Sequence, residues 1–113
     1  MNNPSGILLL DKPRGYTSFK LVSLIRKLCN VQKVGHAGTL DPFATGVMVL
    51  LVGKDFTRLS DRFLTQDKEY IATLHLGIRT DSYDCDGVTI DTSTKEVSLQ
   101  DIEKTLLEFQ GTI

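Results

Sequence analysis

The sequence predicts an α+β fold with a mixed, largely antiparallel sheet and flanking helices. Short apolar runs of strand length alternate with segments whose apolar residues have helical spacing. The connection between segments 69–76 and 88–90 is short enough for a hairpin, which argues against a purely parallel sheet. The 113 residues, 24% charged and 41% hydrophobic, have the composition of one globular domain and exclude a disordered chain or a disulfide-rich miniprotein.

A strand and a helix are expected first. The apolar run 7–10 predicts a buried strand that ends in the Pro/Gly turn 11–15. Thr17 or Ser18 offers an N-cap for the helix, and Asn30 offers a C-terminal stop. The apolar face of this helix consists of Leu21, Val22, Ile25, Leu28 and Cys29.

The middle of the chain combines a loop with a second strand and helix. Segment 35–46 holds three glycines and has neither helical nor strand periodicity, which predicts a loop. The run 47–52 predicts a strand buried on both faces, and Gly53 ends it. Segment 57–64 predicts a further helix.

The last third predicts two strands, a turn and a helix. Alternation over 70–76 indicates a strand, 79–87 an acidic turn, and 88–90 another short strand. Ser98 caps an amphipathic helix that Gly111 ends. The apolar stripe of that helix is Leu99, Ile102, Leu106 and Phe109. The final three residues look like the start of another strand.

The cysteines and apolar runs indicate a reduced, cytoplasmic protein. Cys29 and Cys85 are far apart, form no CxxC motif, and are expected to be small buried hydrophobic residues. The N-terminus lacks the basic segment of a signal peptide. The longest apolar run, 47–52, is far shorter than the roughly 20 residues of a membrane helix, so no membrane partner is expected.

Asp41 is the strongest candidate for a reactive group. It lies in the glycine-rich loop ahead of a buried strand, and Pro42 restricts its backbone to extended conformations. A carboxylate held in a glycine-lined loop is a candidate nucleophile or base. The competing interpretation is that Asp41 caps a turn through its side chain, a common use of aspartate.

The other candidates have simpler explanations on spacing alone. His36 and His75 lack the neighbouring ligands that a zinc site needs, so we expect no metal. Segment 84–87 resembles part of a calcium loop, but Ser82 and Ser93 occupy its first and twelfth ligand positions. The P-loop pattern is absent, because Asp55 follows Gly53 and Lys54. Tyr70 could be a core aromatic residue.

Four motifs, at residues 6–18, 33–46, 68–70 and 76–87, together resemble those of the TruB-type tRNA pseudouridine synthases. Residues 6–18 (GILLLDKPRGYTS) look like the opening motif of that family, and residues 33–46 (KVGHAGTLDPFATG) look like its catalytic motif. Residues 68–70 and 76–87 resemble two further blocks in the family's order. The family's usual His-Thr-Gly is His-Ala-Gly at 36–38, which lacks one hydroxyl.

The resemblance implies a role for each matching residue. Asp41 would be the nucleophile, Tyr70 would stack on the target uracil, and His36 would contact the flipped-out nucleotides. Other residues implied at the site are Gly38 and Thr39 in the loop, Lys12 and Pro13, which would support the loop, and Asp84, whose role is open.

The implied reaction is the isomerisation of a uridine in the T-arm loop of tRNA to pseudouridine, with no cofactor and no metal. The resemblance implies a pseudouridine synthase fold and tRNA as the partner. Two alternatives stay open: a non-catalytic RNA-binding or assembly module, and a guide-RNA-dependent synthase of the dyskerin type. Activity on tRNA without a guide RNA would distinguish a stand-alone synthase from the dyskerin type.

Family members are about twice as long, so the resemblance implies that residues 1–113 are the N-terminal portion of a truncated catalytic domain. The remaining half would supply an arginine that pairs with Asp41, a second aromatic residue, further strands and often a C-terminal RNA-binding domain. We therefore expect little activity from this chain by itself. We also expect an exposed strand edge, which favours self-association.

The formal charge of −1 hides a strong asymmetry. Residues 1–58 carry a net charge of +5, and residues 59–113 carry −6. The basic half contains the turn 12–15 and the loop of Asp41. The distribution of charge therefore favours an RNA partner near this loop, although the near-neutral total does not.

Overall fold

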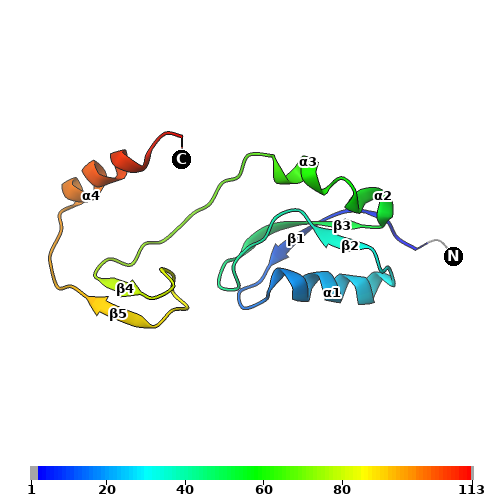
Figure 1. Cartoon of the computed structure of the whole chain (residues 1–113), viewed down its shortest axis with the longest axis horizontal. Coiled ribbons are helices and arrows are strands. Elements are labelled where there is room, and N and C mark those ends of the chain that lie inside the picture. The colour runs from blue at the N-terminus through cyan, green and yellow to red at the C-terminus, as the bar shows by residue number, and fades with distance from the viewer. Residues whose placement is uncertain (1–2, 113) are drawn as a thin grey trace. The chain divides into compact units, whose positions relative to one another are not determined.

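The computed structural model describes residues 3–112 and divides the chain into two compact units, Met1–Ile71 and Ala72–Ile113 (Figure 1). Each unit contains one antiparallel sheet with helices, which confirms the predicted α+β class. No helix within the described residues is long and apolar enough to span a membrane.

A three-stranded sheet forms the centre of the first unit. Strands β1 (Gly6–Lys12), β3 (Gly46–Val52) and β2 (Val34–His36) lie in the order β1-β3-β2, and both pairs are antiparallel. All seven residues of β1 pair with β3, from Gly6 opposite Val52 to Lys12 opposite Gly46. The predictions of β1 and β3 are confirmed, whereas assigning the start of segment 35–46 to a loop was wrong. Three residues of strand are too few to show a period in the sequence.

The two long strands are buried to different extents. Ile7 and Leu9 of β1 are 46% and 67% exposed, so the prediction of a buried strand was wrong for one face of β1. The consecutive residues Leu50 and Leu51 of β3 are fully buried. Because neighbours along a strand point to opposite faces, β3 is covered on both faces at this point, as predicted.

Helix α1 (Ser18–Cys29) packs its apolar face on this sheet. The hydroxyl of Thr17 accepts a hydrogen bond from the backbone N–H of Lys20, so Thr17 is the N-cap. Asn30 ends the helix in the left-handed conformation (φ 52°). Both cap predictions are confirmed. The buried core consists of Leu21, Val22, Ile25, Val34, Met48, Leu50 and Val52.

The segment after β3 differs from its prediction. Two short helices, α2 (Lys54–Thr57) and α3 (Ser60–Leu64), replace the single helix expected over 57–64. Residues 67–75 form no regular element, so the strand expected over 69–76 was wrong. Ile71 is 97% exposed there, and period-2 alternation cannot make a strand without a partner for its backbone hydrogen bonds.

The second unit contains a hairpin and a helix. Strands β4 (Ile78–Thr80) and β5 (Thr89–Thr92) pair antiparallel, so the hairpin prediction is confirmed with a later first strand than expected. Helix α4 (Leu99–Leu106) begins at the predicted Ser98 cap and continues as a 3-10 turn, Leu107–Phe109. The helical hydrogen bonding of this segment therefore ends before Gly111, the residue that was predicted to end the helix.

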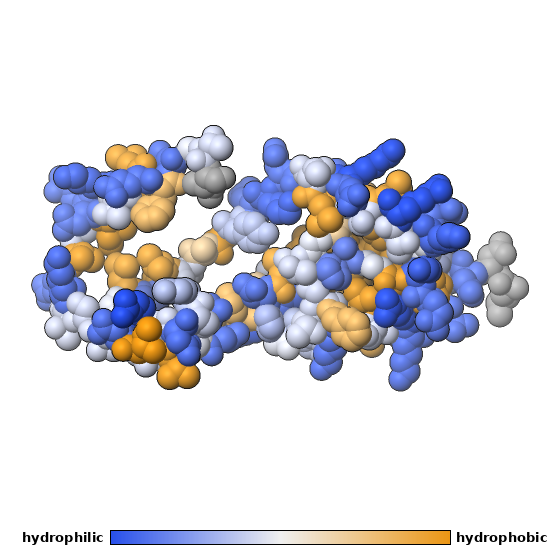
Figure 2. All heavy atoms as spheres, in the orientation of Figure 1, coloured by the Kyte–Doolittle hydropathy of each residue, from blue (hydrophilic) through white to orange (hydrophobic). Residues whose placement is uncertain are grey.

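The second unit has no buried residue among those described. Figure 2 shows hydrophobic side chains at its surface. Leu99, Leu106 and Phe109 of the predicted apolar stripe are 71%, 54% and 71% exposed. The predicted amphipathic pattern is present, but the described residues do not bury it.

Three smaller expectations have mixed outcomes. Cys29 is half-buried beside the core, but Cys85 is exposed, so the expected burial of Cys85 was wrong. The strand expected at the last three residues reaches Ile113, which lies outside the described residues. Strand β1 is at an edge of its sheet, and the self-association expected from such an edge stays a prediction.

Candidate functional site

The loop 37–45, which carries Asp41, joins β2 to β3. The backbone N–H of Ala37 donates to the carbonyl of Val49 at 2.9 Å and holds the start of the loop against β3. Gly38 has φ +98° and Gly46 has φ +133° near the two ends of the loop. These backbone conformations are strained for other residues, which explains glycine at both positions.

The buried side chain of Lys12 ties this loop to the turn after β1. Lys12 is 0% exposed, and its Nζ donates to the carbonyls of Pro13, Tyr16 and Pro42 at 3.0, 2.9 and 3.1 Å. A buried ammonium is costly unless its donors are satisfied, and three carbonyls satisfy all three. Because Pro42 follows Asp41 directly, Lys12 fixes the backbone beside the candidate nucleophile.

Three further hydrogen bonds hold the loop. The N–H of Gly15 donates to the carbonyl of Pro42 at 2.6 Å. The N–H of Leu40 donates to the hydroxyl of Ser18 at 3.4 Å, which connects the loop to the first residue of α1. The N–H of Ala44 donates to the backbone carbonyl of Asp41 at 2.9 Å and closes a turn.

The carboxylate of Asp41 is exposed and forms no hydrogen bond or ion pair with residues 3–112. The turn at Asp41 is closed by its backbone carbonyl and not by its side chain. The interpretation of Asp41 as a side-chain turn cap therefore finds no support in the geometry. Because the backbone of Asp41 is held in place and its carboxylate has no partner among the described residues, the carboxylate is suited to attack a ligand.

His36 lies at the end of β2, next to the loop. It is half-buried, and its Nδ1 is buried without a hydrogen-bond partner among the described residues. A buried ring nitrogen without a partner is costly, so a donor or acceptor from a ligand would be favourable there. Gly38 is half-buried and Thr39 is exposed, which leaves the Thr39 hydroxyl accessible.

Tyr70 and Asp84 lie away from regular elements. Tyr70 is 66% exposed on the irregular segment 67–75, so the expectation of a core residue was wrong. Asp84 belongs to the second unit, where its Oδ1 accepts from the Ser82 hydroxyl at 2.7 Å and from the Asp86 N–H at 3.0 Å. These bonds, led by Ser82, hold the pKa of Asp84 below its ordinary value of 3.8.

Within residues 3–112, no group of three or more His, Cys, Asp or Glu side chains is arranged to hold a metal ion. The acid-rich stretch after β4 is thus a loop whose carboxylates bond to its own hydroxyl and N–H groups.

Three supporting residues were missed from the sequence. Gly15, Tyr16 and Ser18 all bond to Lys12 or to the loop. The sequence by itself indicates Ser18 only as an alternative helix cap. The sequence holds one signal for Ser18, which is that it directly follows another hydroxyl residue. Because Thr17 caps the helix, the hydroxyl of Ser18 is free to bond with another partner.

The chain matches the family model described as "TruB family pseudouridylate synthase (N terminal domain)" over residues 26–113. It is 59% identical over 108 residues to a Chlamydia felis protein named tRNA pseudouridine synthase B. Proteins of the same name from Protochlamydia amoebophila and Desulfotalea psychrophila are 58% and 47% identical over 108 and 111 residues.

These alignments cover 96% of this chain but 46%, 41% and 44% of the three relatives, respectively. The chain therefore spans less than half the length of the curated relatives it matches. Asp41 and His36 lie inside the residues matched by the family model, while Lys12 and Pro13 precede them.

Proposed function

The chain belongs to the TruB family of pseudouridylate synthases, and from this we propose that it serves pseudouridine formation in tRNA, with Asp41 as the nucleophile. The observation that carries the proposal is the exposed carboxylate of Asp41, which has no partner among residues 3–112 and sits on a loop fixed by Lys12. The substrate we propose is a uridine in the T-arm loop.

The reaction rearranges one nucleoside without a net loss of atoms. The glycosidic bond from N1 of uracil to the ribose breaks, the base rotates, and C5 of uracil forms the new bond to the ribose. C5 then loses its proton and N1 gains one. The Asp41 carboxylate suits attack on either the ring or the ribose, because it forms and releases an ester-like adduct.

The target uridine must leave its stack before Asp41 can reach it, which costs a few kcal/mol. Tyr70, two-thirds exposed, is available to stack on the extruded uracil. Such stacking contributes about 1–3 kcal/mol per base. His36, with its buried and unbonded Nδ1, is proposed to bind the same nucleotides, and Gly38 and Thr39 provide the adjoining loop surface.

A chimera tests the proposal, because the chain aligns with 46% of the Chlamydia felis relative, which can supply the remaining part. The matched 108 residues of the Chlamydia felis protein are replaced by those of this chain. Tritium release from tRNA labelled at C5 of uridine then measures turnover. We expect the chimera to be active, and Asp41→Asn to lower its turnover by at least about 10³-fold, as for other removed nucleophiles.

Asp61→Asn is the matched control, because Asp61 is an exposed residue on α3 whose side chain has no hydrogen-bond or ion-pair partner within residues 3–112. This variant should keep the turnover of the chimera. Unchanged turnover in Asp41→Asn would refute the nucleophile assignment. An inactive chimera that still binds tRNA would instead favour the non-catalytic RNA-binding module.

A further inference from the structure

Positive charge is concentrated in the first unit around α1, a helix to which the catalytic proposal assigns no role. Residues 12–40 include six Lys or Arg residues and no Asp or Glu. Lys12 is buried under the loop, which leaves five cations: Arg14, Lys20, Arg26, Lys27 and Lys33. Three of these belong to α1 and two flank it.

The outer face of α1 presents part of this charge as a continuous strip. Lys20, Ser23 and Lys27 recur at intervals of three and four residues on one face of α1. Tyr16 before the helix and Asn30 at its C-cap line pockets together with these residues and extend the face at its two ends. We call these five residues the α1 strip. All five are exposed, whereas the core residues of α1 lie on its other face. The two lysines are two helical turns, or about 10 Å, apart.

Two shallow pockets line the α1 strip and share Ser23 and Lys27. One, of about 320 Å³, also includes Tyr16 and Lys20. The Nζ of Lys20 lies 4.7 Å from the centre of the Tyr16 ring, which holds the ammonium at the surface.

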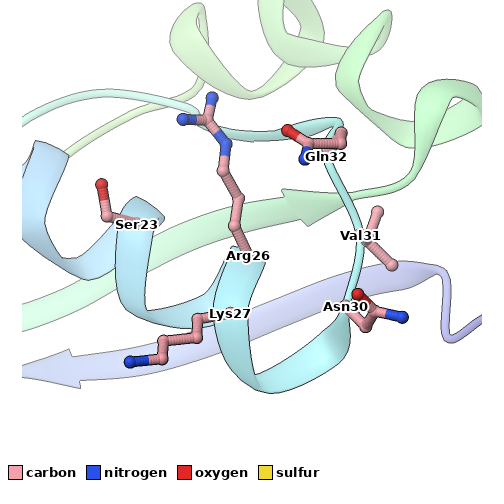
Figure 3. Close-up of a pocket in the computed structure, with 6 residues that line it drawn as sticks. All are labelled: Ser23, Arg26, Lys27, Asn30, Val31 and Gln32. Atoms are coloured by element: carbon pink, nitrogen blue, oxygen red, sulfur yellow. The ribbon is translucent and has the colours of Figure 1, made fainter.

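The second pocket, of about 340 Å³, lies at the C-terminal end of α1 (Figure 3). Arg26 donates one guanidinium N–H to the carbonyl of Val34 at 3.2 Å, while its Nε has no hydrogen-bond partner among the described residues. The amide side chains of Asn30 and Gln32 also line this pocket (Figure 3). Neither pocket is lined by an acidic residue, so the whole strip favours an anion.

The α1 strip starts next to the Asp41 loop. Ser18, the first residue of α1, accepts a hydrogen bond from Leu40, and Gly15 donates to Pro42. We propose that the α1 strip binds the phosphate backbone of the tRNA whose uridine reaches Asp41. This inference rests on the proposed function. Cations spaced along a rigid helix, with hydroxyl and amide groups between them, are suited to contacts with successive phosphates.

The test measures binding of the full chain to a fluorescein-labelled T-arm stem-loop RNA by fluorescence anisotropy, over a range of salt concentrations. The variant Lys20→Gln/Lys27→Gln keeps good helix formers at both positions. We expect its Kd to rise about tenfold or more near 0.15 M salt. The slope of log affinity against log salt should fall by about two, one for each lost phosphate contact.

The matched control is Lys95→Gln/Lys104→Gln, which removes the same charge from exposed positions of the second unit. It should change the Kd less than about twofold, because a specific contact is lost only in the α1 strip. Lys20→Arg/Lys27→Arg should keep the wild-type Kd and slope. Circular dichroism of each variant reports whether α1 is still folded.

Equal losses in the two Gln pairs, an unchanged slope in the α1 pair, or no RNA binding by the wild-type chain would each overturn the inference. Its failure is distinguishable from that of the proposed function. Asp41→Asn tests the chemistry through turnover of the chimera and should leave RNA binding by the chain unchanged. Binding that depends on the α1 strip without turnover would refute only the catalytic proposal.

Discussion

The two units of the chain differ in what holds them together. The first unit buries an apolar core between α1 and its sheet, and Leu50 and Leu51 are completely inaccessible. The second unit has well-formed elements of similar kinds but no buried residue among those described. Its hairpin and helix are shaped by bonds close in sequence, such as Ser98 with Asp101 and Asp84 with Ser82.

This difference indicates which contacts stabilise each unit. Burial of apolar surface is the dominant favourable term in folding, and within the described part of the chain only the first unit has a buried cluster. Caps and turn hydrogen bonds contribute about 1 kcal/mol each and shape a segment without stabilising it strongly. We therefore expect the first unit to resist unfolding and the second to open readily.

A core truncation should show the largest effect. Leu50→Ala removes a fully buried side chain, and we expect a loss of about 2–5 kcal/mol in the free energy of unfolding of the first unit. Leu106→Ala, at a position 54% exposed, should cost less than about 0.5 kcal/mol. Urea unfolding followed by circular dichroism measures both. Similar losses would remove the distinction between the units.

The second largest effect should come from Lys12. Lys12→Met keeps the volume of the side chain but removes the three bonds to Pro13, Tyr16 and Pro42. We expect a loss of about 1–3 kcal/mol from the unpaired carbonyls. Amide exchange should accelerate at Gly15, whose partner is also Pro42. Unaltered exchange at Gly15 would show that Lys12 does not hold the loop.

The two helix caps allow a matched comparison. Thr17→Ala and Ser98→Ala each remove one hydroxyl that accepts an N–H at a helix start, a change of about 1 kcal/mol. In the first unit the packed face of α1 should preserve the helix, whereas α4 should lose much of its helicity. Backbone chemical shifts measure both. A fully helical α4 in Ser98→Ala would show that it is stabilised by more than its cap.

The smallest expected effect is the destabilisation of the Asp84 loop in the second unit at low pH. The pKa of Asp84 is lower in the folded loop than its ordinary value of 3.8. The Asp84 carboxylate therefore stabilises the loop above pH 3.8, and this stabilisation is lost as the pH falls through the lower pKa of the folded state. Ser82→Ala removes the leading cause and should raise the pKa of Asp84 toward 3.8. An NMR titration of the carboxyl carbon measures it. An unchanged pKa would exclude the hydroxyl as the cause.

The sequence predicted much of the local structure around the candidate site, because glycine, proline and cap residues act over a few positions. The Asp41 loop, the Thr17 and Asn30 caps of α1 and the Ser98 cap of α4 could all be located from local patterns. No local pattern locates the bonding of Lys12, because its acceptor Pro42 is 30 residues away. Only the family resemblance implied that Lys12 supports the loop. The position of β1 was predicted correctly, but the sequence did not show which of its side chains are buried. Ile7 and Leu9 were expected to be buried and are exposed.

The amino-acid sequence by itself determined the α+β class, the ends of the two main helices and the position of the candidate nucleophile. Only the tertiary structure decided that Lys12 is buried beneath the Asp41 loop, that the Asp41 carboxylate has no partner among the described residues, and that residues 69–76 form no strand. The physical reason is the range of the interactions. Caps and turns depend on neighbours in sequence, whereas burial, strand pairing and a loop's supports require partners that only folding brings near.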